Sequence, residues 1–208
     1  MTWILRGALA AFVMLAAPLA ALVPAPAQAQ AGDPAVATVQ TFYDGLTAGM
    51  KAGGSAKARA EKLKPVIEQT FDLAGMTALS VGPAATWAAI TPADQKALID
   101  AFSRYTFANY ARNFDSYSGE KFIVDPAVNQ RGTDKYLKST MKPTSGDSVA
   151  FNCRLHEVDG KWKIIDVYLA GNISTLAQKR ADFGATLASG GAQALVKKLN
   201  ALADQMLG

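Results

Sequence analysis

The spacing of apolar residues changes twice along this chain, and these two changes constrain its fold more than any other feature. Apolar side chains recur every three or four residues from Val36 to Phe114, alternate with polar ones from Lys121 to Ala170, and return to helical spacing after Asn172. Helices are therefore grouped before and after a block of strands. This segregated order predicts an α+β domain in which an antiparallel sheet of about four strands packs against N-terminal and C-terminal helices.

Capping signals divide the N-terminal helical part. Asp33 before Pro34, and Thr91 before Pro92, each place a capping side chain ahead of a proline at the first helical position. Helices are predicted over residues 34–53, 55–70, 73–82 and 92–114, with a further turn or two around Trp87. Pro65 is expected to start, kink or divide the second of them.

The strand block has one strong turn signal. Asp159-Gly160 separates two strand-like runs, and both residues accept the positive φ that a type I′ hairpin requires. Strands are predicted over residues 121–125, 135–142, 147–158 and 161–170. After them, Asn172 is predicted to cap a helix that runs to Ser189, and Gly190-Gly191 is predicted to separate it from the last helix.

The first 29 residues have the pattern of a secretory signal peptide. A basic side chain, Arg6, precedes an apolar stretch over residues 7–23, and Ala27-Gln28-Ala29 or Ala29-Gln30-Ala31 supplies the small-x-small cleavage pattern. We therefore expect cleavage after residue 29, or after 31, and export of residues 30–208 as one domain. A retained membrane anchor is the alternative interpretation of the same apolar stretch.

Few residues could support catalysis or metal binding. Cys153 and His156 are the single cysteine and histidine, whereas the usual zinc clusters need three or four such ligands. They lie three apart on a predicted strand, so their side chains should point to opposite faces and cannot act as a catalytic pair. The chain has 21 basic and 17 acidic residues, an excess too small to predict nucleic-acid binding. We expect no catalytic residue, no metal site and no cofactor.

Several segments, taken in their order along the chain, resemble one family. They are Leu79-Ser80-Val81-Gly82, Trp87, Thr91-Pro92-Ala93-Asp94-Gln95, the aromatic helix ending in Tyr110, Trp162-Lys163-Ile164-Ile165-Asp166-Val167 and Arg180-Ala181-Asp182-Phe183. Through them nearly the whole mature chain is similar to the MlaC, or toluene-tolerance, family of periplasmic lipid carriers. Residues 165–174 and 190–195 resemble its hopanoid-associated HpnM branch. The phospholipid-carrying branch usually has a Gly-Val-Ser-like sequence where this chain has Gly171-Asn172-Ile173-Ser174.

The resemblance implies a periplasmic, non-enzymatic carrier with an apolar cavity between the sheet and the helices. It would receive a hopanoid, or alternatively a phospholipid, from an inner-membrane lipid transporter and deliver it to an outer-membrane acceptor. Candidate cavity residues are the large apolar side chains Phe42, Leu46, Trp87, Phe102, Tyr110, Phe151, Val167, Tyr168, Phe183 and Leu187. The alternative is that these side chains close a solid core.

Two sets of polar residues are candidates for contacts with a lipid head group. Tyr43, Tyr105 and Tyr168 could supply hydroxyls, because a buried tyrosine usually finds a polar partner. A basic run after the first helix could contact anionic head groups or an acidic partner, and it comprises Lys57, Arg59, Lys62 and Lys64 together with the preceding Lys51. A solvated helix face is the other interpretation of this run.

Two further functions stay open from the residues alone. A hydrolase or isomerase acting on a small apolar substrate could use Asp166 or Asp115 as acid or base, although Asp166 could equally hold a structural hydrogen bond. A scaffold or adaptor would have a solid core. A tunnel in the structure would count against the scaffold.

Overall fold

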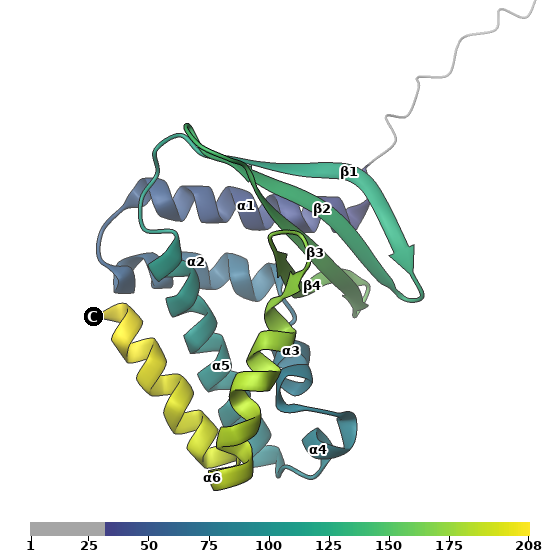
Figure 1. Cartoon of the computed structure of the whole chain (residues 1–208), viewed down its shortest axis with the longest axis vertical. Helices are drawn as coiled ribbons and strands as arrows, with labels where there is room; N and C mark the ends of the chain where they lie inside the picture. The colour runs from purple at the N-terminus through teal and green to yellow at the C-terminus, as the bar shows by residue number, and fades with distance from the viewer. Residues whose placement is uncertain (1–31) are drawn as a thin grey trace, which may run out of the picture. The chain divides into compact units, whose positions relative to one another are not determined.

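The computed structural model describes residues 32–208, so the signal peptide predicted for residues 1–29, and both candidate cleavage sites, lie outside the described residues (Figure 1). The helices are α1 (Pro34–Ala52), α2 (Ala56–Thr70), α3 (Leu73–Val81), α4 (Ala84–Ala88), α5 (Pro92–Asn113) and α6 (Thr175–Leu207). The strands are β1 (Lys121–Arg131), β2 (Asp134–Lys142), β3 (Val149–Val158), β4 (Lys161–Leu169) and β5 (Ile173–Ser174). This order confirms the predicted α+β class.

The predicted capping residues begin the helices as expected. Asp33 Oδ1 accepts a hydrogen bond from Ala35 N at 2.8 Å, and Thr91 Oγ1 accepts one from Asp94 N at 3.2 Å. Pro65, in contrast, lies inside α2 and neither starts nor divides it. Pro65 is exposed, so water can reach the carbonyl group that its missing N–H leaves unpaired.

The sheet is an antiparallel meander. Its strands lie side by side in the order β1-β2-β3-β4-β5. Asp159 and Gly160 join β3 to β4 with φ values of 49° and 73°, which confirms the predicted hairpin. In β3, Cys153 and Leu155 are buried whereas Arg154 between them is half-buried, in agreement with the predicted alternation.

Strand β1 is longer than predicted. The prediction ended it at Asp125, before Pro126, but the strand continues to Arg131 and turns through Gly132 into β2. Its register shifts between Val124 and Val128, around the proline that has no N–H to donate. The interruption is tolerated because β1 is an edge strand.

The last helix begins two residues later than predicted. Asn172 was expected to cap it, but Ile173 and Ser174 form the short strand β5 beside the end of β4. Ser174 Oγ is the capping group and accepts a hydrogen bond from Ala177 N at 2.9 Å. The predicted break near the second half of this helix is confirmed, because Gly191 has a non-helical φ of 66° inside α6.

The helices pack on one another in succession, beginning with α1 on the sheet. Helix α1 contacts β1 and β4, α2 packs on α1 and α5, and α6 lies along α5 (Figure 1). The N-terminal end of α1 is fixed to the sheet by polar contacts: Thr38 Oγ1 donates to the Trp162 carbonyl at 3.0 Å, and Lys135 Nζ lies 2.7 Å from Asp33 Oδ2. Lys135 Nζ also lies 4.1 Å from the centre of the Trp162 ring.

The Asp33 carboxylate should stabilise the fold above pH 4 and lose that contribution in acid. Burial alone would raise the pKa of Asp33, but hydrogen bonds from Lys135 and Ala35 N and the Lys135 charge lower it below its ordinary value of 3.8. A carboxyl whose pKa is lower in the folded state stabilises at pH values above its unfolded pKa. We expect Asp33→Asn to lower the free energy of unfolding by about 1–2 kcal/mol at pH 6.

Urea unfolding of wild type and Asp33→Asn across pH 6 to pH 3 measures this contribution. The difference between the two proteins should shrink as the pH falls below 3.8, because the unfolded chain is then protonated at Asp33 before the folded protein is, and it should be smallest below the lowered pKa of the folded state. Asp204→Asn is a suitable control, because Asp204 forms a solvent-exposed ion pair with Arg104 that should contribute little. A difference in the free energy of unfolding between wild type and Asp33→Asn that stays constant with pH would contradict this explanation.

Cys153 and His156 belong to separate networks. Cys153 is 1% exposed and its sulfur lies 4.0 Å from Tyr43 Oη, whereas His156 Nε2 lies 2.8 Å from Asp72 Oδ2. Burial raises the pKa of the Cys153 thiol to about 12. The side chain therefore has the environment of a structural cysteine.

We expect Cys153 to react with Ellman's reagent at pH 8 at least about a hundredfold more slowly in the folded protein than in urea, because access and thiolate content are both low. The measurement is the rate of thiol release with and without denaturant. Equal rates would contradict the burial of this side chain.

Candidate functional site

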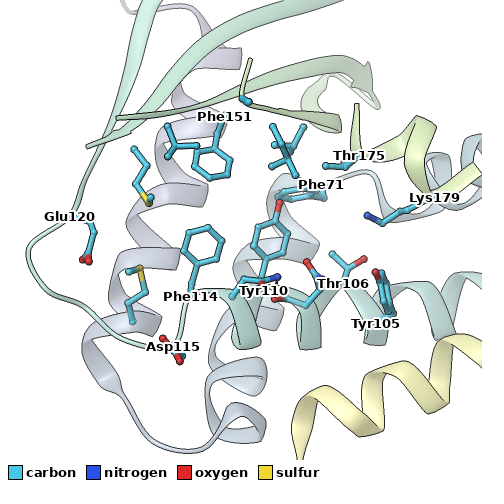
Figure 2. A pocket seen from close by; sticks show the side chains of 18 of the residues that line it. Phe71, Tyr105, Thr106, Tyr110, Phe114, Asp115, Glu120, Phe151, Thr175 and Lys179 are labelled. Atoms are coloured by element: carbon cyan, nitrogen blue, oxygen red, sulfur yellow. Dashed lines mark hydrogen bonds between the residues drawn. The ribbon is translucent and has the colours of Figure 1, made fainter. Parts of the chain in front are cut away.

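A cavity of about 680 Å³ lies between α5 and the sheet (Figure 2). This volume is within the range of small-molecule sites in proteins. The helix α5 provides one wall, the ends of β2, β3 and β4 provide the opposite wall, and the start of α6 borders it. The lining residues are Met50, Phe71, Met76, Tyr105, Thr106, Asn109, Tyr110, Asn113, Phe114, Asp115, Ser116, Glu120, Met141, Pro143, Val149, Phe151, Val167, Leu169, Ala170, Thr175 and Lys179.

Aromatic rings form the middle of the cavity wall and support one another. Phe42, Phe71 and Tyr110 pack edge to face, with centroid distances of 4.8 Å between the two phenylalanines, 5.2 Å from Phe42 to Tyr110 and 5.7 Å from Phe71 to Tyr110. Phe114 lies 6.0 Å from Tyr110 and 6.3 Å from Phe151 on the sheet. Such pairs are favourable beyond the area that they bury, so they stabilise a largely aromatic wall.

The charged residues lie at the two ends of the cavity. Figure 2 shows Asp115 and Glu120 at one end, Lys179 at the other, and Phe114, Tyr110 and Phe151 between them. The two ends therefore differ in charge. An elongated ligand could place an apolar body against the aromatic residues and a polar group at one end.

Burial changes the protonation equilibria of the cavity residues. It lowers the pKa of Lys179, although the charges of Asp166 and Asp182 oppose this change. It raises the pKa of Tyr110 far above its ordinary value, and burial with the Asp182 charge raises the pKa of Tyr105. Both phenols are therefore neutral hydrogen-bonding groups at physiological pH.

The structure brings three of the sequence-predicted cavity residues into the lining, namely Tyr110, Phe151 and Val167. Four others are buried core side chains with at most 4% of their surface exposed: Phe42, Leu46, Phe102 and Phe183. Of these, Phe42 lies directly behind the wall, against Phe71 and Tyr110. Trp87 and Leu187 are half-buried and pack against the core outside this lining.

Tyr168 is directed away from the cavity. Its neighbours in β4, Val167 and Leu169, line the cavity, and alternation along a strand directs Tyr168 to the other side of the sheet. There its ring lies 6.4 Å from that of Tyr136. Tyr43 is also outside the lining, where its hydroxyl shares a hydrogen bond of 2.6 Å with Ser139 Oγ. Of the three tyrosines considered for head-group contacts, Tyr105 is the one in the lining.

The basic run on α2 is divided by the fold. Lys57, Lys62 and Lys64 are exposed, but Arg59 is 7% exposed and its Nε donates to the Ala111 carbonyl at 3.0 Å. Arg59 therefore ties α2 to the end of α5, and its guanidinium is not presented to a partner. That Lys57, Lys62 and Lys64 contact a lipid head group or a partner protein stays a prediction.

Several lining residues were absent from the sequence prediction. Val149 and Leu169 share a sheet face with Phe151 and Val167, and Phe114 continues the aromatic stripe of α5, so period and alternation could have found these three. Met50 lies on the same apolar stripe of α1 as Phe42 and Leu46, so helical spacing marks it as interior but does not show that it reaches the cavity, and no local pattern marks Met141. Lys179 was missed because a lysine on a helix is normally assigned to solvent.

The aspartates considered as catalytic groups have other environments. Asp166 is 2% exposed and its Oδ1 accepts hydrogen bonds from Leu176 N at 3.0 Å and Thr175 Oγ1 at 3.2 Å, at the start of α6. This is the structural role weighed for it from the sequence. Asp115 is exposed at one end of the cavity. Within residues 32–208 no group of three or more His, Cys, Asp or Glu side chains is placed to hold a metal ion.

Comparison with known proteins places this fold and cavity in a family. A family model described as MlaC protein matches residues 37–201. The fold is similar to that of a phospholipid-binding protein from Ralstonia solanacearum solved in complex with a phospholipid, with a TM-score of 0.72, 22% sequence identity, and coverage of 84% of this chain and 99% of the other. No functionally curated protein matches the sequence, and none of the described helices is long and apolar enough to cross a membrane. Because the family model spans most of its length, the chain belongs to the MlaC protein family.

Proposed function

We propose that this protein is a carrier that holds a lipid in the cavity between α5 and the sheet, and that the lipid is a phospholipid. The observation that carries the proposal is an aromatic-lined cavity of about 680 Å³ with polar residues at its ends, in a chain of the MlaC family. A protein of similar fold was solved with a phospholipid bound. A solid-core scaffold would have no use for such a cavity.

The hydrophobic effect alone does not transfer a lipid from a membrane into such a carrier. Burying ~400 Å² of lipid tail at ~25 cal/mol per Å² contributes about 10 kcal/mol, but a bilayer offers the tail the same burial. The shape of the cavity, the contacts with the polar end of the lipid, and docking to membrane partners must therefore decide the direction of transfer. Catalysis is not needed, and we propose that the protein has no enzymatic activity.

The proposed location is the periplasm, after removal of residues 1–29. The proposed partners are an inner-membrane lipid transporter as donor and an outer-membrane acceptor. The signal-peptide pattern and the family support this arrangement. The exposed lysines Lys57, Lys62 and Lys64 are candidates for the partner contact.

A hopanoid is the second candidate cargo. It is favoured by the similarity of residues 165–174 and 190–195 to the HpnM branch, and by Gly171-Asn172-Ile173-Ser174 in place of the Gly-Val-Ser-like segment. A rigid pentacyclic hopanoid needs a smooth cavity, whereas two acyl tails need a forked one. The two cargoes also differ at their polar end, since a phospholipid carries a phosphate.

The test is mass spectrometry of the organic extract from protein purified without detergent from its native periplasm. We expect about one phospholipid per protein. If hopanoid is bound in stoichiometric amount instead, the protein is still a lipid carrier, but its cargo is a hopanoid and not a phospholipid. Protein that is repeatedly empty, and that takes up no lipid from vesicles, would contradict the proposal.

A further inference from the structure

We propose that Lys179 binds the anionic group of the cargo, a phosphate or a carboxylate, at the α6 end of the cavity. The inference rests on the proposed lipid-carrier function and adds to it the chemical class of the ligand and its orientation. It concerns a lysine on the second turn of α6 whose side chain lines an otherwise largely apolar cavity.

Lys179 differs from the other shielded lysines in its contacts. Lys135 Nζ is paired with Asp33, and Lys198 Nζ donates to the Asp182 carbonyl at 3.1 Å. Among residues 32–208, no carboxylate or carbonyl lies within ion-pair or hydrogen-bond distance of Lys179 Nζ. Its neighbour is the Tyr105 ring, whose centre is 5.7 Å away. The charges of Asp166 and Asp182 act on it from beyond ion-pair distance. Among the described residues, the ammonium group therefore has no direct ion-pair partner.

Lys179 is half-buried, and a bound anion would make this arrangement more favourable. Removing an ammonium group from water is costly, and burial lowers the pKa of Lys179 for that reason. The charges of Asp166 and Asp182 offset this cost only in part, because neither carboxylate forms an ion pair with Lys179 and the net change in its pKa is still downward. A ligand anion would supply both the charge and the hydrogen-bond acceptor that the ammonium group lacks.

The remaining cavity residues define the orientation of the ligand. Asp115 and Glu120 at the opposite end would repel an anion, so we expect the charged group of the ligand to lie near Lys179 (Figure 2). Tyr105 lines the cavity beside Lys179 and is a polar neighbour of the anion. The aromatic rings of Phe114 and Phe151 then contact the tails.

The experiment compares two lipids that differ only in the anion. Phosphatidylcholine vesicles containing equal amounts of dioleoyl phosphatidate and dioleoylglycerol are incubated with the protein, and the lipids bound are quantified by mass spectrometry. We expect wild type to take up phosphatidate roughly tenfold over dioleoylglycerol, the effect of a charge-assisted hydrogen bond. Lys179→Met should bring the ratio close to one, and Lys179→Arg should retain the preference.

Matched controls separate charge recognition from folding and from the carrier function. Lys197→Met changes an exposed lysine of the same helix and should keep the wild-type ratio. Dioleoylglycerol uptake by Lys179→Met should persist, which shows that the cavity is intact. A preference for phosphatidate that survives in Lys179→Met, or equal uptake of both lipids by wild type, would overturn the inference and leave the carrier function standing. No uptake by wild type of any lipid in the vesicles, phosphatidylcholine included, would instead overturn the carrier function.

Addition of inorganic phosphate distinguishes a lipid anion from a free one. We expect it to leave phosphatidate uptake unchanged, because the lipid tails hold its phosphate in place. Displacement of phosphatidate by inorganic phosphate in wild type, with none in Lys179→Met, would assign Lys179 to free phosphate and overturn the assignment to lipid.

Discussion

Replacing Phe102 by alanine should lower the free energy of unfolding by about 3–5 kcal/mol. Phe102 is fully buried, and its ring packs against Tyr105 and Phe183 with centroid distances of 6.4 Å and 6.3 Å. Truncation removes these contacts and leaves a void that the surrounding helices α5 and α6 cannot fill. Urea unfolding followed by tyrosine and tryptophan fluorescence measures the loss.

Phe114→Ala is the matched control for Phe102→Ala. Phe114 follows α5 directly and carries the same ring, but one side of that ring already faces the cavity. We expect it to cost about 1–2 kcal/mol, because less apolar area returns to water. A loss of only about 1–2 kcal/mol for both variants would mean that Phe102 also faces open space, as the sequence-based list of cavity residues supposed.

Replacing Asn109 by tryptophan should reduce lipid uptake at least about tenfold. Asn109 lines the cavity one helical turn from Tyr105 and Asn113, so an indole at this position would occupy space proposed for the tails. Excluding ~60 Å² of tail burial at ~25 cal/mol per Å² costs about 1.5 kcal/mol, which is tenfold in affinity. Uptake of phospholipid from vesicles by the purified protein is the measurement.

Ala93→Trp provides the control for this variant. It places the same indole on the exposed first turn of α5, outside the lining. Both variants should unfold within about 1 kcal/mol of wild type, because neither replaces a buried contact. Wild-type uptake by Asn109→Trp would show that the lipid lies elsewhere, whereas a similar loss in both variants would point to a general effect of the added indole.

Local patterns predicted most of the fold. The helical spacing of apolar residues, the capping side chains of Asp33 and Thr91 and the Asp159-Gly160 turn each act within a few residues, so sequence alone could place these elements. The errors arose where pairing between strands overrides the secondary structure that the local sequence favours. Strand β1 continues beyond Pro126 because β2 pairs with it, and Ile173 joins β4 before the last helix begins.

The site could be predicted only in part. An apolar residue at helical or alternating spacing must face the interior, and Tyr110, Phe151 and Val167 as well as Phe102 and Phe183 satisfy that rule. The spacing of apolar residues does not show whether a side chain meets another element or an open cavity. Phe102 meets Phe183 from α6 and is enclosed, whereas Tyr110 and Phe151 face each other across the space between α5 and the sheet.

The sequence by itself determined the class of fold, the order of its elements, the scarcity of groups for catalysis, and the family resemblance. These properties depend on residue types and on spacing along the chain. The tertiary structure decided which apolar side chains line the cavity, that Arg59 is used inside the fold, and that Lys179 lies at the cavity. These outcomes depend on how helices and strands that are distant in sequence pack together, and local spacing carries no information about that packing.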